Sequence, residues 1–213
     1  MSGEKRIVDI AVSGLRVESE EDSPKKIVGY AAVFDKEARI GSMFREVFRP
    51  GAFKRAISEG QDVAALINHD PSLLLGRTAS GTLKLIEDKD GLRAELEPAD
   101  TQTTNELVTH VGRGDVAGMS IAFRAQNEKW SDPDNKDGEL REVLDADLYD
   151  VSFVTYPAYG ETSVSLRTTE QIFKEHRQEL DGADDSIAQE REDMRLRIEL
   201  GELEMEEANA DSE

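Results

Sequence analysis

VAGMSIAFRA (residues 116–125) and LREVLDADLYDVSFVTYPAY (residues 140–159) are the two segments that decide the fold of this chain. Both are rich in β-branched and aromatic residues, which favour strands, and Pro157 ends the second strand. Polar and turn-forming residues fill 127–139 and predict a loop between them. We therefore expect two strands joined by a long turn.

The rest of the first 167 residues predicts further strands and a few short helices. Strands are predicted at 6–12, 25–34 and 62–69, a hairpin at 82–98 that turns at Asp90-Gly91, and helices at 50–60 and at 103–112, the latter starting with the capping box Thr103-x-x-Glu106. This pattern predicts an α+β fold, either an α+β body or a β-barrel with helices outside it.

The composition excludes several classes of protein. The 213 residues include 46 acidic and 26 basic side chains, and the formal net charge is −20. Nucleic acids and anionic membrane surfaces both require a basic face, so we expect neither as a direct partner. The absence of cysteine excludes a disulfide framework, a thiolate zinc site and a cysteine nucleophile. No segment has the ~20 consecutive apolar residues of a membrane span, and a cytosolic protein is expected.

The charge is unevenly distributed along the chain. Residues 168–213 hold 16 acidic and 5 basic side chains, a net charge of −11, which leaves −9 for residues 1–167. Apolar residues at helical spacing predict an amphipathic helix over 185–207. We expect one domain over 1–167 and an acidic tail over 168–213 that is helical or disordered.

His69 is the histidine best placed for chemistry. It follows an apolar strand and stands in Asn68-His69-Asp70-Pro71, where the chain turns, so its imidazole could face a cleft. The alternative is a turn histidine that is bonded to Asp70. A metal site of His69, Asp70 and a distant carboxylate is a further alternative, but the chain has no paired-histidine spacing. We expect no metal and no cofactor.

Ser120 and a group of carboxylates are the remaining candidates. Side chains alternate along a strand, so Ser120 points away from its apolar neighbours Met119 and Ile121. By the same rule Asp150 and Ser152 lie opposite to their apolar neighbours Tyr149, Val151 and Phe153. A carboxylate on that side could orient an imidazolium. The alternatives are an ordinary surface serine and ordinary acidic residues. Asp145 and Asp147 have the parity of Val151 and share the open face only if a β-bulge intervenes.

Five segments, taken in order, resemble the prohead maturation proteases of tailed bacteriophages, which are serine peptidases related in fold to the herpesvirus capsid-assembly protease. The segments are GYAAVFD (29–35), FREVFRPGAFKRAI (44–57), ALINHDPSLLLGR (65–77), GDVAGMSIAF (114–123) and DADLYDVSFVTYPAY (145–159). The resemblance spans about residues 25–167. It implies a herpesvirus-protease-like β-barrel with a few flanking helices, to which the acidic C-terminal tail is added.

The resemblance also implies the site. Ser120 would be the nucleophile, His69 the general base and Asp150 the acid that orients the base. The family often has glutamate where Asp150 stands, and aspartate is one methylene shorter, so Asp147 is the alternative. Herpesvirus relatives use a second histidine, but His110 lies on the helix predicted over 103–112 and is not assigned to that role.

Backbone N–H groups would stabilise the oxyanion, and Arg77 or Arg113 could assist them.

The function implied by the family is that of a serine endopeptidase packaged inside the phage procapsid in the host cytoplasm. Its substrates would be the major capsid protein and the scaffold, and usually the protease itself. Whether the active form is a homodimer stays open. The first alternative is a non-enzymatic scaffold or assembly factor of the phage head, which the acidic, helical tail would suit. The second alternative is a metal-dependent hydrolase.

Overall fold

The computed structural model describes residues 4–8, 13–18, 25–132, 135–136, 138–155 and 171–178. The chain divides into two units, Met1–Thr168 and Thr169–Glu213. In the second unit residues 171–178 are helical, and the helix predicted over 185–207 lies outside the described residues. Within the described ranges, no helix has both the length and the apolar character that crossing a membrane requires.

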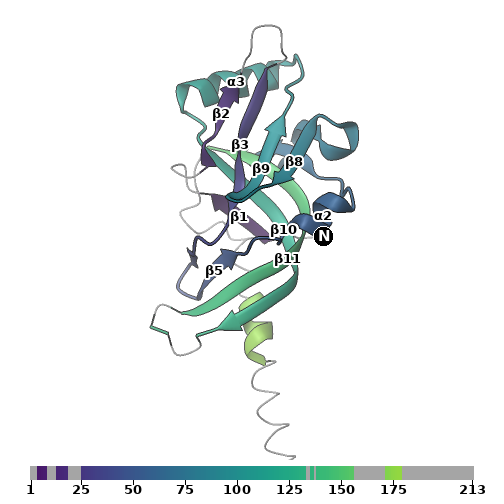
Figure 1. The fold of residues 1–213 in the computed structure, drawn as a ribbon. Helices are drawn as coiled ribbons and strands as arrows, with labels where there is room; N and C mark the ends of the chain where they lie inside the picture. The colour runs from purple at the N-terminus through teal and green to yellow at the C-terminus, as the bar shows by residue number, and fades with distance from the viewer. Residues whose placement is uncertain are drawn as a thin grey trace, which may run out of the picture. The chain divides into compact units, whose positions relative to one another are not determined.

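The first unit consists mostly of strands (Figure 1). Its elements are, in chain order, β1 (Glu4–Val8), β2 (Arg16–Glu18), β3 (Lys26–Val33), β4 (Ala38–Ile40), β5 (Phe44–Phe48), α2 (Lys54–Ser58), β6 (Ala64–Ile67), β7 (Asp70–Arg77), the short 3₁₀ helix η1 (Thr78–Ser80), β8 (Leu83–Glu87), β9 (Gly91–Leu96), α3 (Gln102–Arg113), β10 (Gly118–Ser131) and β11 (Glu139–Val154). The strands predicted at 25–34, 62–69 and 116–125 and the hairpin at 82–98 are confirmed. The strand predicted within 140–159 is confirmed as far as Val154, and residues 156–159 lie outside the described residues.

The strands form two sheets. The larger sheet has seven strands in the order β1-β10-β11-β5-β4, and β6 joins it on β11 and carries β7. The smaller sheet has the order β2-β3-β9-β8. The long antiparallel pair β10 and β11 runs through the first unit (Figure 1). β11 is long enough to pair in parallel with β5 near its start and with β6 near its end.

The α+β class is confirmed, but the predicted barrel is not. A barrel closes only when its edge strands bond to each other. In the part of the chain that the structure describes, β1, β4 and β7 each pair with one strand only, so the larger sheet stays open. The sequence patterns predict strands but not their partners, and this is why they did not reveal two separate sheets.

Three boundary predictions are wrong. Asn127–Ser131 is strand and not loop, because these polar residues pair with the start of β11 and Trp130 packs against Phe44 with the ring centroids 5.0 Å apart. Helix α3 begins after Thr101, whose side chain accepts a hydrogen bond from the Thr104 N–H, and not with Thr103. It ends at Gly114, which has a φ of 81°, and not at Gly112.

One hydrophobic core lies between the two sheets. Met119, Ile121 and Phe123 of β10 and Ile27, Ala31 and Leu92 of the smaller sheet belong to it. The sheets approach closely at Gly29 of β3, where an added Cβ would lie 2.7 Å from the Met119 sulfur. This packing contact, together with the pairing of β10 with β1 and β11, positions the strand that carries Ser120.

Helix α2 and its flanking residues fill the gap that β5 and β6 leave along β11. The Ala146 N–H donates to the Ala52 carbonyl at 2.8 Å, and the Leu148 N–H donates to the Gln61 side-chain oxygen at 2.9 Å. The backbone of β11 is therefore bonded just before Asp150, where the polar side chains of the site begin.

Candidate active site

A two-residue turn positions His69. Ile67 at the end of β6 pairs with Asp70 at the start of β7, and the residues between them, Asn68 and His69, have φ values of 50° and 59°. Two consecutive left-handed residues are typical of a tight hairpin turn, and asparagine tolerates that conformation well. The Asn68 N–H donates to the Phe153 carbonyl at 3.0 Å, so the turn is bonded to the end of β11.

Ser120 lies on the central strand β10 with its side chain fully buried. It pairs with Ser152 of β11 on one side and with a residue of β1 on the other. Its Oγ lies 2.6 Å from Nε2 of His69 and 2.9 Å from the carbonyl oxygen of Arg6. One hydroxyl proton thus has two acceptors within reach, and the histidine is the nearer.

Asp150 completes the group from β11. Its Oδ1 lies 2.7 Å from Nδ1 of His69, and the two side chains are only 13% and 9% exposed. A carboxylate can only accept, so Nδ1 carries the imidazole proton and Nε2 presents a lone pair to Ser120. The structure therefore brings together the three residues selected in the sequence, in the tautomer that allows His69 to take the Ser120 proton.

A β-bulge determines which carboxylates share this face. Ala122 pairs with Asp150 but the next residue, Phe123, pairs with Leu148, so Tyr149 is an extra residue on β11. Asp147, opposite Arg124, consequently points to the same side as Asp150. This is the condition under which Asp147 could have been the third member of the site.

Asp147 is nevertheless bonded elsewhere. It accepts hydrogen bonds at 2.6 Å from Arg55, from Gln61 and from Gln126. The hydrogen bond from the Arg55 guanidinium is the main reason that the pKa of Asp147 lies below its ordinary value. Arg55 also bonds Asp145 at 2.8 Å. These two carboxylates anchor helix α2 to β11, and Asp150 is the one that reaches His69.

The other candidates from the sequence lie apart from this group. Asp70 accepts from the N–H and the hydroxyl of Ser72, so it does not hold the His69 ring. His110 and Arg113 both contact Asp115. Neither arginine considered for the oxyanion bonds a residue of the site, because Arg77 pairs with Asp62 on the surface.

Two contacts of the site were not assigned from the sequence. Ser152 is fully buried, donates to Asp150 Oδ1 at 2.8 Å and accepts from the His69 N–H at 3.1 Å. The strand alternation placed Ser152 on the correct face, and this signal could have identified it. The Arg6 carbonyl has no such signal, because a main-chain group carries no residue identity.

A buried ion cluster lies next to the site. It consists of Glu4 and Arg6 of β1, Glu46 of β5, Glu128 of β10 and Arg141 of β11. Burial alone would raise the pKa of Glu46, but the charges and hydrogen bonds of Arg6 and Arg141 together outweigh burial and lower it. Arg6 links the two groups, since its side chain joins the cluster and its carbonyl contacts Ser120.

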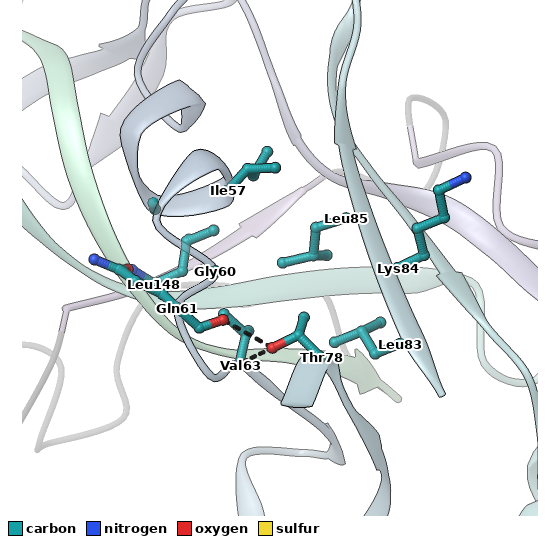
Figure 2. Close-up of a pocket in the computed structure, with 10 residues that line it drawn as sticks. Ile57, Gly60, Gln61, Val63, Thr78, Leu83, Lys84, Leu85 and Leu148 are labelled. Atoms are coloured by element: carbon teal, nitrogen blue, oxygen red, sulfur yellow. Dashed lines mark hydrogen bonds between the residues drawn. The ribbon is translucent and has the colours of Figure 1, made fainter. Parts of the chain in front are cut away.

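A separate cavity of about 190 Å³ lies between α2, η1, β8 and β11. Figure 2 shows the apolar side chains of Ile57, Val63, Leu83 and Leu85 around it, with Thr78 bonded to the backbone of Gln61 and Val63. None of the residues that line it belongs to the group around His69.

No curated protein matches this chain. Among solved structures it is similar to the bacteriophage T4 capsid assembly protease gp21, at 10% sequence identity and a TM-score of 0.41, over 71% of this chain and 98% of that chain. The sequence model of the family described as caudovirus prohead serine protease matches residues 13–178, which include every side chain of the site. This match covers most of the sequence, and the chain therefore belongs to the caudovirus prohead serine protease family.

Proposed function

We propose that this protein is the serine endopeptidase that processes the capsid precursor inside the phage procapsid, with Ser120 as its nucleophile. The observation that carries the proposal is the continuous chain of contacts from Ser120 Oγ to His69 Nε2, at 2.6 Å, and from His69 Nδ1 to Asp150 Oδ1, at 2.7 Å. Nucleophile, base and orienting acid within hydrogen-bond reach are the arrangement that acyl transfer requires. Membership of a serine protease family supports it independently.

In the acylation step Ser120 Oγ attacks the scissile carbonyl carbon while His69 Nε2 takes its proton. The imidazolium then donates this proton to the leaving amine, and the acyl group remains on Ser120. Asp150 stays ionised and stabilises the positive charge on the ring. A water molecule activated by the same nitrogen hydrolyses the acyl-enzyme and restores the serine.

Access to the nucleophile requires movement. Ser120 and Ser152 have no exposed surface. A substrate carbonyl needs a path to this hydroxyl, so we expect the segments around Ser120 to move aside when the substrate binds.

The substrate class follows from the family. A caudovirus prohead protease would act on the major capsid protein or scaffold within the procapsid, and self-processing would add the protease to its own substrates. We expect the cleaved bonds to lie in extended, flexible segments, because a peptide must enter the site as a single strand.

The test is co-expression with the major capsid protein encoded in the same genome, followed by mass spectrometry of the protein termini. The wild-type chain should produce defined new termini, and the Ser120→Ala variant should leave the precursor at full length. Processing by purified Ser120→Ala protein would show that the assignment is wrong. Assembly of heads that depends on the chain but not on Ser120 would favour the scaffold alternative.

The acidic tail over 168–213 is proposed to retain the protease inside the shell. Its net charge of −11 makes it unlike the rest of the chain, and the family match ends at residue 178, within its first part. A chain truncated after Gln178 should keep its protease activity but be packaged less. Equal packaging of both chains would exclude this role for residues 179–213, and truncation after Arg167 tests the whole tail.

A further inference from the structure

Ser152 contacts both His69 and Asp150. Its hydroxyl donates to Asp150 Oδ1 at 2.8 Å, so its single proton is used there. Its lone pairs face His69, whose main-chain N–H lies 3.1 Å away and whose Nδ1 lies 3.2 Å away. The same oxygen therefore contacts the backbone of the histidine, the ring of the histidine and the acid.

This combination acts on a strained position. His69 has a φ of 59°, a left-handed conformation that a non-glycine residue adopts only when its surroundings favour it. The hydrogen bond from the His69 N–H to Ser152 is one such restraint, and it acts at the residue itself rather than at its neighbours. Moving this backbone would move Nε2 relative to Ser120.

The carboxylate needs a similar restraint. Asp150 has a short side chain on β11, and its Oδ1 must face Nδ1 to hold the ring. Ser152, two residues later on the same face, donates to that same oxygen. Its hydroxyl therefore fixes the orientation of the acid and of the base together.

We propose that Ser152 is a positioning residue of the active site, which holds His69 and Asp150 in the geometry that keeps the ring proton on Nδ1. It does not touch the substrate and exchanges no proton during the reaction. The inference rests on the proposed function for its effect on catalysis, but the state of the His69 ring can be measured without any substrate.

The experiment uses the full chain with ¹⁵N-labelled histidine and compares wild type with Ser152→Ala. NMR follows the Nδ1 proton of His69, and cleavage of the purified capsid precursor gives kcat and KM. The Ser152→Ala variant should show exchange of the Nδ1 proton with water that is faster by roughly tenfold, as expected for one lost hydrogen bond. Its kcat should fall roughly 10- to 100-fold, as for a misplaced catalytic group, with KM unchanged.

Two further variants make the result specific. Ser13→Ala removes another buried serine hydroxyl, which donates to the Ala117 carbonyl at 2.7 Å, and it should change neither the exchange rate nor kcat. Ser152→Cys replaces the hydroxyl with a somewhat larger thiol that is a weaker donor and should give intermediate values, so it answers the question even if Ser152→Ala does not fold.

Wild-type exchange and wild-type kcat in the folded Ser152 variants would overturn the inference. A wild-type chain that does not cleave the precursor, or a Ser120→Ala chain that still cleaves it, would instead contradict the proposed function. In that case the Nδ1 exchange rate still decides whether Ser152 holds the His69 ring.

Discussion

Asp150 Oδ1 lies 2.7 Å from Nδ1 of His69, across the parallel pairing of β11 with β6. In this pairing Phe153 lies opposite Ile67. The turn after Ile67 brings the His69 imidazole back over β11 to Asp150, which lies three positions before Phe153. The aspartate side chain, which is one methylene shorter than that of glutamate, is therefore long enough to reach the ring.

Replacing Asp150 should nearly abolish activity. Asp150→Asn places an amide that can donate to Nδ1, which favours the wrong tautomer, and kcat for the capsid precursor should fall roughly 10³- to 10⁴-fold. Asp147→Asn is the matched control, since Asp147 bonds Arg55, Gln61 and Gln126, and its kcat should stay close to that of wild type. A reversed pair of results would transfer the acid role to Asp147.

Acid should destabilise the chain partly through Asp147. Its folded-state pKa lies below the ordinary value of 3.8, mainly because of the hydrogen bond from Arg55. A lowered pKa contributes stability above the unfolded-state pKa, and this contribution is lost as the pH falls through the folded-state value. Urea unfolding measured from about pH 6 to pH 3 should therefore show a smaller loss of stability below about pH 4 in Asp147→Asn than in wild type. Parallel curves for the two proteins would count against this contribution.

The buried ion cluster should be sensitive to the loss of one member. Arg141 is 2% exposed and contacts Glu4, Glu46 and Glu128, so Arg141→Met removes one of the two arginines that pair with the buried carboxylates of Glu4 and Glu46. The free energy of unfolding should fall by about 3–5 kcal/mol. In contrast, Arg16→Met breaks an exposed pair with Glu18 and should cost about 0–1 kcal/mol. The free energy of unfolding is measured by urea denaturation. Similar losses for both variants would show that the buried ion cluster contributes no more to stability than an exposed ion pair.

The turn that carries His69 should depend on residue 68. Asn68 has a φ of 50°, and its side-chain oxygen accepts from the Thr155 N–H at 3.2 Å. Asn68→Val should destabilise the fold by about 1–2 kcal/mol, because a β-branched residue is strained there, and should also lower kcat. Asn68→Gly adopts the same backbone conformation freely and should keep most of the activity. Equal kcat values for the valine and glycine variants would show that the turn conformation does not position the histidine.

Much of this site is visible in the sequence because it depends on local rules. Alternation along a strand placed Ser120, Asp150 and Ser152 opposite to their apolar neighbours, and the apolar strand before Asn68 placed His69 at a turn. These are properties of a few consecutive residues, and short-range sterics determine them.

Other features were beyond the sequence because they depend on which strands meet. The parallel pairing of β6 with β11 brings His69 to Asp150, and no pattern within either segment encodes the partner of a strand. The bulge at Tyr149 put Asp147 on the same face as Asp150, although their parity along the strand predicts opposite faces. Arg55 and the two glutamines, which lie far away in sequence, occupy Asp147 and leave Asp150 for the histidine.

The sequence by itself thus determined the α+β class, the family and the residue types of the site, since these follow from local patterning and from motifs. Only the tertiary structure decided that the sheets remain open, that Asp150 rather than Asp147 contacts the base, and that Ser152 touches both. The physical reason is that strand register, bulges and hydrogen bonds between distant residues form when the whole chain packs, and they are not carried by any one segment.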